Sequence, residues 1–204
     1  MSGIKKCAII GYEPESLRVK IDDVEKENTL LKHVNALIIE AYHNECNEFH
    51  TGLRRGCEMW VGESIISIRD LYETMKVCHV QAYKGYHNCR LESELDELKH
   101  VSGLCDSHVY ISRSKLERDK VNDVYANYIL NKTDMVIAIY SPKVPDPFLT
   151  PLTKTIKHNK TQQLIVIDPF DDNFTVKHYN KPKGWLTGNQ YRHHIHRIYR
   201  THGI

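Results

Sequence analysis

Several features are missing from this 204-residue sequence, and each absence excludes a class of protein. No apolar run reaches the roughly 18–20 residues that a membrane-spanning helix needs. The opening residues, MSGIKKCAIIG, have too short an apolar core for a secretory signal peptide, and they are better interpreted as a strand. Hydrophobic residues make up 41% of the chain and charged residues 26%, so general disorder is excluded as well. We expect a soluble intracellular protein with no membrane partner.

The six cysteines lack the paired spacing of a disulfide framework or a zinc motif. They are scattered singly, with no CxxC pair, and several fall inside apolar runs. A free cysteine in such a run behaves as a small buried hydrophobe. We therefore predict free thiols.

Acidic residues are absent from 173–204, which hold six of the 28 Lys and Arg residues and five of the 13 His residues. Residues 1–172 consequently carry 22 basic and 26 acidic residues, although the whole chain has a net charge of +2. We predict a body over residues 1–168 and a basic, His- and Tyr-rich C-terminal extension over 169–204.

Hydrophobic patterning in the body predicts six strands that alternate with five helices. We expect strands over 5–10, 46–51, 76–80, 107–111, 135–140 and 163–167. The helices are expected over 30–41, 56–75, 91–101, 114–129 and 150–159. Right-handed crossovers then give a Rossmann-like α/β fold, a mostly parallel sheet of about six strands with helices on both faces.

Three of the helix boundaries are predicted from capping residues. Gly103 follows the third helix in the usual C-terminal position. Ser114 and Glu117 match a capping box that would open the fourth helix. Thr150 followed by Pro151 is a favourable N-cap and first-position pair for the fifth.

Ligands of open α/β sheets bind beyond the carboxyl ends of the strands, where three segments of this chain are expected: 11–17, 51–60 and 141–150. In the second, Gly52 and Gly56 permit a tight turn, and Arg54 and Arg55 can supply charge for a phosphate. An ordinary strand–helix turn with solvated arginines explains the same residues. No GK[ST] follows and no GxGxxG occurs, so neither a Walker loop nor a classical dinucleotide site is indicated.

Taken in order along the chain, these segments resemble the YpsA-like branch of the SLOG superfamily. The resemblance rests on Gly11-Tyr12-Glu13-Pro14 and on Thr51-Gly52-xxx-Gly56-x-Glu58-x-Trp60-xx-Glu63. Arg118-Asp119, Tyr128 and the strand over 134–140 are similar to a later segment of that family. The similarity covers roughly residues 5–168.

The resemblance implies a Rossmann-like domain that binds a nucleotide-derived ligand at the carboxyl edge of its sheet. The candidate ligand-binding residues are then Gly11, Tyr12, Pro14, Thr51, Gly52, Arg54, Arg55, Gly56, Glu58, Trp60, Arg118, Thr150 and Thr153. We expect the turns at 52–56 and 148–151 to converge on one pocket. We expect the protein in the cytoplasm, of a bacterium or of a virus-infected bacterial host.

Two departures from the family pattern bear on function. Phe148-Leu149-Thr150 replaces the usual Gly-Gly/Ser-Thr turn, and Arg118-Asp119 replaces Arg-Asn. The Pro-Gly-Gly-x-Gly-Thr signature of the related phosphoribohydrolases is absent, which counts against that activity.

The leading hypothesis is a protein that senses or sequesters a small phosphate-containing nucleotide ligand. One variant of it is a viral protein that sequesters a nucleotide immune signal of its host. An alternative is an N-glycosidic hydrolase or transferase in which the carboxylate of Glu58 or Glu63 stabilises or attacks an oxocarbenium-like ribose carbon. A third is single-stranded nucleic-acid binding by the Tyr191–Arg200 segment, which we favour less than a tail docked on an acidic body.

No metal site and no cofactor are predicted. His193, His194 and His196 lie close together, but no Cys or carboxylate lies nearby in the sequence to complete a physiological site. We expect at most adventitious binding of Ni²⁺ or Zn²⁺ there. We expect a homo-oligomer in which the basic tail packs on the acidic body of a neighbouring subunit.

Overall fold

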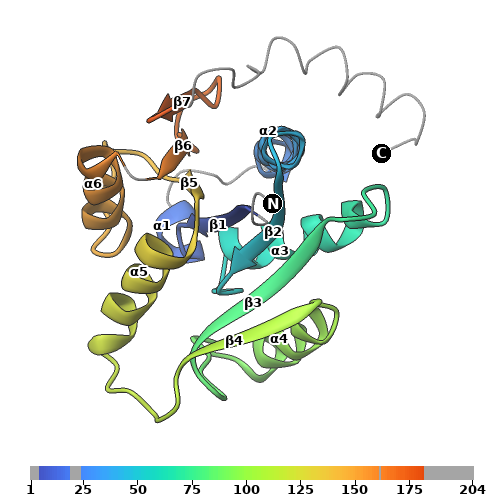
Figure 1. Cartoon of the computed structure of the whole chain (residues 1–204), viewed down its shortest axis with the longest axis vertical. Coiled ribbons are helices and arrows are strands. Elements are labelled where there is room, and N and C mark those ends of the chain that lie inside the picture. The colour runs from blue at the N-terminus through green and yellow to red at the C-terminus, as the bar shows by residue number, and fades with distance from the viewer. Residues whose placement is uncertain (1–4, 19–23, 161, 182–204) are drawn as a thin grey trace.

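The computed structural model describes residues 5–18, 24–160 and 162–181, and the predicted Tyr191–Arg200 segment with its three clustered histidines lies outside these ranges. Seven strands form one sheet in the order β4-β3-β2-β1-β5-β6-β7 (Figure 1). The first six are mutually parallel, and β7 runs antiparallel to β6. Their bounds are β1 Lys5–Gly11, β2 Cys46–Thr51, β3 Lys76–Tyr83, β4 Ser107–Ser112, β5 Met135–Ile139, β6 Gln163–Ile167 and β7 Val176–Tyr179.

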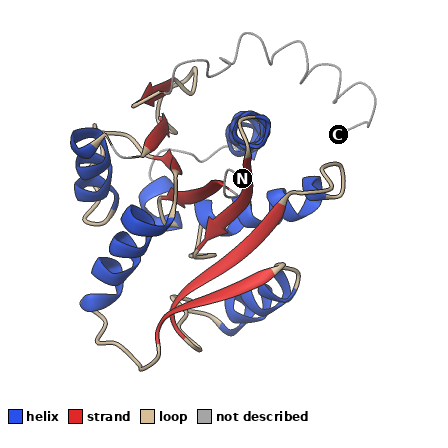
Figure 2. Cartoon of the chain, viewed as in Figure 1, coloured by secondary structure: helices blue, strands red, loops and turns tan. Residues whose placement is uncertain are grey.

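Six helices occupy the described chain, namely α1 Pro14–Arg18, α2 Val24–His43, α3 Cys57–Arg69, α4 Glu92–Gly103, α5 Lys120–Lys132 and α6 Leu149–Asn159. Contacts join α2 to α3 and α3 to α4, whereas α5 packs on β3 and β4 and α6 on β6. Because parallel crossovers are right-handed, α2, α3 and α4 lie on one face of the sheet, and α5 and α6 lie on the other (Figures 1 and 2). None of the helices in these ranges is long and apolar enough to cross a membrane.

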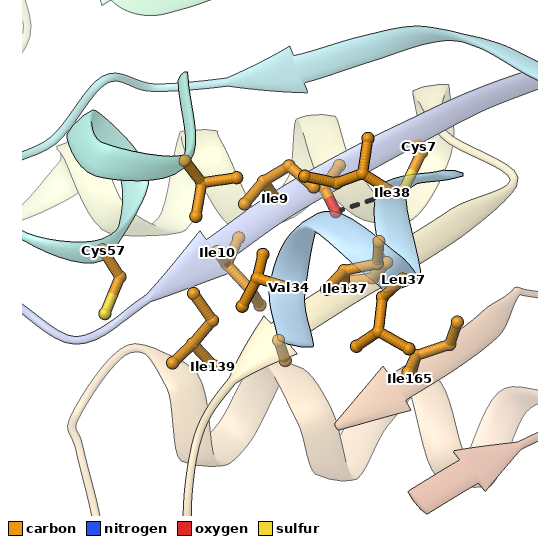
Figure 3. Close-up of a cluster of buried hydrophobic side chains, with 14 of the residues drawn as sticks. Cys7, Ile9, Ile10, Val34, Leu37, Ile38, Cys57, Ile137, Ile139 and Ile165 are labelled. Carbon is orange, nitrogen blue, oxygen red and sulfur yellow. Dashed lines mark hydrogen bonds between the residues drawn. The ribbon is translucent and has the colours of Figure 1, made fainter. Parts of the chain in front are cut away.

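The core lies where the central strands are covered on both faces. Every residue of β5 and β6 is buried, as is most of β1. Figure 3 shows Ile9 and Ile10 of β1 in one cluster of buried side chains with Val34, Leu37 and Ile38 of α2 and with Ile137 and Ile139 of β5. β-Branched residues suit such positions because they pack well on a pleated surface. All six cysteines are free, as predicted.

The Rossmann-like α/β class and all six predicted strands are confirmed, with one strand more than expected. The additional strand, β7, lies inside the predicted extension and adds an antiparallel edge. It escaped prediction because it is short and lies within a polar, basic stretch. The helix α1 was not predicted either.

Three predicted helix boundaries are wrong. α3 ends at Arg69, not at residue 75. α4 does end at Gly103, as predicted, although this glycine keeps a negative φ and is not a left-handed cap. α5 begins at Lys120 rather than at Ser114, because the Ser112 hydroxyl bonds to the backbone of Ser114 instead. α6 begins one residue before Thr150.

Candidate functional site

The turns after β1 and β2 pack directly on one another at the carboxyl edge of the sheet. The Cys57 amide at the start of α3 donates to the Tyr12 carbonyl over 3.1 Å. A Cβ on Gly11 would lie 2.5 Å from the Cβ of Cys57. Gly56 has a φ of +83°, and a Cβ there would lie 2.8 Å from the Tyr12 carbonyl oxygen. The two glycines are therefore required for close packing.

Tyr12 ties this packed pair of turns to the loop after β5. Its hydroxyl donates to the Ser141 carbonyl over 3.0 Å and accepts from the Ser141 amide over 3.1 Å, and it also contacts the Val144 carbonyl. Its ring packs against Tyr140 and Phe170. Burial raises the pKa of the Tyr12 hydroxyl. The side chain is thus part of the core and holds the loops together.

Arg54 and Glu58 form a buried ion pair under these turns. One Glu58 oxygen receives the Arg54 Nε and Nη2 groups at 2.8 and 2.7 Å. The other accepts the Gly52 amide at 3.1 Å and the Tyr125 hydroxyl at 3.4 Å. Burial alone would lower the pKa of Arg54, but the charges of Glu58 and Tyr125 and the hydrogen bond to Glu58 together outweigh it, and the pKa is raised. Both carboxylate oxygens of Glu58 are therefore hydrogen-bonded, and Glu58 holds the Arg54 side chain in place.

Arg55 points the other way and pairs with two carboxylates. Its guanidinium lies 2.9 Å from Glu15 and 2.9 Å from Glu94, and Arg90 also reaches Glu15 at 2.9 Å. The Arg55 backbone amide donates to the Asn88 side chain over 3.4 Å. This network fastens the loop before α4 to the turn after β2.

The start of α6 is capped from within the chain. Asp146 accepts the Phe148 and Leu149 amides at 2.8 Å each, while Thr150 accepts the Asp146 amide at 2.9 Å. The Thr153 hydroxyl donates to the Leu149 carbonyl over 2.8 Å. Two of the amides that the predicted phosphate contact would use are therefore already bonded to a carboxylate.

The predicted turns at 52–56 and 148–151 do lie together, but side chains fill the space between them. The Arg54 guanidinium carbon lies 4.2 Å from the centre of the Phe148 ring and 5.4 Å from that of Tyr125. The packed Arg54, Phe148 and Tyr125 side chains therefore occupy the position where we expected a shared pocket.

A cleft of about 890 Å³ opens beside this contact, at the same edge of the sheet. Its walls are the loops that follow β3 and β4, together with the turn after β1 and the start of α5. The lining residues are Glu13, Tyr86, His87, Asn88, Cys89, Arg90, Lys115, Leu116, Glu117, Arg118 and Asn122. A narrow space lined by Gly52, Arg54, Tyr125, Tyr86 and Asn122 adjoins it, and the last two residues line both.

Three cations and the start of α5 line the cleft, and one of the cations, Arg90, also pairs with Glu15 at 2.9 Å. Arg90, Lys115 and Arg118 face two acids, Glu13 and Glu117. Asn122 lies in the first turn of α5, whose N-cap residue, Asp119, makes no side-chain capping bond within the described chain. The first amides of such a helix attract negative charge.

The predicted site residues separate into three groups. Arg118 lines the large cleft, and Gly52 and Arg54 line the narrow space. Pro14, Arg55, Gly56 and Trp60 line a second cavity of about 240 Å³. Gly11, Tyr12, Thr51, Glu58 and Thr153 are buried, and Thr150 bonds within the α6 cap.

Sequence reasoning missed most of the cleft because no local motif marks Tyr86, Asn88, Arg90, Lys115 or Asn122. The available signal was position alone, since these residues follow the carboxyl ends of β3 and β4. Glu63 lies elsewhere on α3, where burial and the nearby Glu97 raise its pKa.

Comparison with known families agrees with this architecture. The YpsA model, described as the YspA SLOG family, matches residues 7–172. The chain belongs to this family. SLOG membership indicates a nucleotide-ligand-binding domain and specifies no particular ligand. No curated protein matches the chain.

Proposed function

We propose that this SLOG protein binds a small, phosphate-containing, nucleotide-derived ligand in the cleft between the 84–91 and 113–119 loops. The cleft carries the proposal: at about 890 Å³ it lies in the range of small-molecule sites, and it combines three cations with the start of α5, whose N-cap residue makes no side-chain capping bond within the described chain. The phosphate would meet Arg118, Lys115 and the positive end of the α5 dipole.

The other end of the ligand has suitable partners in the same cleft. Tyr86 offers an aromatic ring, and Asn88 and Asn122 offer amide groups that both donate and accept hydrogen bonds. Tyr86 and Asn122 also border the narrow space that leads to Arg54. Glu58 and Tyr125 hold Arg54 there, so this wall of the site is already organised before a ligand arrives.

Binding is favoured over glycosidic hydrolysis because neither candidate carboxylate lines the cleft. Glu58 is buried, and both its oxygens are engaged by Arg54, Gly52 and Tyr125. Glu63 lies on α3 close to Glu97 and His100 of α4. The protein would then act by sensing or sequestering its ligand, and sequestration of an immune nucleotide by a viral protein is one form of that role.

Calorimetric titration with mono-, di- and cyclic nucleotides and with ADP-ribose forms tests the proposal. We expect one or more phosphate-bearing compounds to bind, and the corresponding unphosphorylated nucleoside to bind much more weakly. Arg118→Gln should weaken that binding about tenfold, which corresponds to the loss of one charge-assisted hydrogen bond.

Arg113→Gln is the matched control, because Arg113 is exposed in the same loop but does not line the cleft. It should leave the affinity within about twofold. Absence of binding across the whole panel, or equal losses in both variants, would refute a phosphate site in this cleft.

A further inference from the structure

A second cluster of chemically active side chains lies in the middle of the sheet, away from the cleft. Glu48 and His50 are two residues apart on β2, so their side chains leave the same face of the sheet. Cys78 of β3 is the register partner of His50 and shares that face. One potential ligand atom from each of the three residues lies within 4.8 Å of the other two.

We propose that Glu48, His50 and Cys78 form a binding site for a zinc-class divalent cation. A thiolate, an imidazole nitrogen and a carboxylate oxygen together are a donor set that suits Zn²⁺ and does not suit Mg²⁺ or Ca²⁺, which take oxygen ligands. Three protein ligands leave one position for solvent. This inference does not depend on the proposed cleft.

The present hydrogen bonds keep the imidazole in place for such a role. The His50 Nε2 atom lies 2.9 Å from a Glu48 oxygen, and its Nδ1 atom lies 2.7 Å from the Tyr128 hydroxyl of α5. Whichever nitrogen turns to the ion, the other keeps an oxygen partner. Bonding of the second nitrogen is the usual way in which proteins orient a ligating histidine.

The distances require only a small adjustment. Tetrahedral ligands at Zn–N and Zn–S bond lengths lie about 3.6 Å apart, so no separation between the ligand atoms must close by more than about 1.2 Å. The cation would enter past Glu48, whose side chain is 22% exposed, while His50 is buried. Binding exchanges the Cys78 thiol proton for the ion, so one proton is released for each ion bound.

Cobalt titration of the full-length chain tests the site, because a thiolate ligand to Co²⁺ gives a near-ultraviolet charge-transfer band. The background is a chain carrying His193→Ala, His194→Ala and His196→Ala, which removes the adventitious tail histidines. We expect one equivalent of Co²⁺ with a thiolate band, displaced by Zn²⁺. Cys78→Ser should abolish the band, whereas the control Cys89→Ser, at the half-buried cleft cysteine, should retain it.

Absence of the band in the background chain, or its survival in Cys78→Ser, would overturn the proposal. If Cys78→Ser does not fold, the Glu48→Gln variant tests the site instead, because this partly exposed side chain can be changed without disrupting the core. We expect a loss of at least tenfold in Co²⁺ affinity in a folded Glu48→Gln variant. An unchanged affinity there would also reject the site.

Discussion

The guanidinium carbon of Arg54 lies 4.2 Å from the centre of the Phe148 ring, which joins the turn after β2 to the start of α6. The charge is held over the ring by Glu58, which accepts two of its N–H groups. A cation over an aromatic face is favourable, and more so when both groups are removed from water. This contact closes the space between two predicted phosphate-binding turns and leaves the neighbouring cleft as the candidate site.

Glu58→Gln should destabilise the fold by about 3–5 kcal/mol, because it leaves the Arg54 charge buried without a partner. Urea denaturation at pH 7 measures the loss. Arg54→Met combined with Glu58→Gln should lose less than the sum of the two single changes, because no unpaired charge remains.

Glu73→Gln, at an exposed carboxylate, is the control for that experiment and should change the free energy of unfolding by under about 0.5 kcal/mol. A Glu58→Gln variant that loses less than about 1 kcal/mol would show that the Arg54–Glu58 pair is not buried in solution as described.

Gly56→Ala should cost about 2–4 kcal/mol. Its φ of +83° is unfavourable for a side chain, and the new Cβ would lie 2.8 Å from the Tyr12 carbonyl oxygen and 2.9 Å from Pro14. Gly103→Ala is matched to it, since a Cβ there meets nothing within 4 Å and the residue is helical. That change should stabilise the protein by up to about 1 kcal/mol in thermal or urea unfolding. Equal effects of the two substitutions would contradict the packed turn.

The strands were predictable because burial on both faces leaves a mark in the sequence. β5 is a continuous apolar run, and its five residues are all buried. Helix ends were less predictable, since a cap depends on which polar group is nearest in space. Asp146 caps α6 although Thr150 and Pro151 matched the expected pattern.

The site was harder to predict than the fold because its residues act through partners far away in the sequence. Arg55 pairs with Glu15 and Glu94, which are about 40 residues away on either side. His50 meets Cys78 only through the register of β2 and β3. Nothing local to these residues reveals such pairings, and the arginines were therefore assigned to phosphate.

Glu63→Gln should raise the stability of the protein at pH 7 and leave it unchanged near pH 4. Burial first, and then the charge of Glu97, raise the pKa of Glu63 in the folded protein. The folded state thus holds this proton more tightly than the unfolded state, and stability falls as the pH rises through the raised pKa. Because the side chain is partly open to solvent, we expect a gain of under about 1 kcal/mol.

Paired urea titrations at the two pH values measure this difference, with Glu73→Gln as the exposed reference. A loss of stability in Glu63→Gln at pH 7 would indicate that the carboxylate makes a favourable contact there. A gain would confirm that keeping the ionised Glu63 carboxylate partly buried beside Glu97 costs stability.

Glu117→Gln should tighten the binding of a phosphate ligand, in contrast to Arg118→Gln one residue further on. Both side chains line the cleft, and Glu117 is one of its two acids, paired with Lys120 at 2.5 Å. Removing its charge leaves the cations of the cleft less opposed, so the affinity should rise about two- to fivefold at low salt, or under about 1 kcal/mol. Because the groups are exposed, the gain should fade towards 1 M salt, where the screening length is about 3 Å. Calorimetric titration of both variants at two salt concentrations measures this. Changes of the same sign in the two variants would show that charge does not govern binding in this cleft.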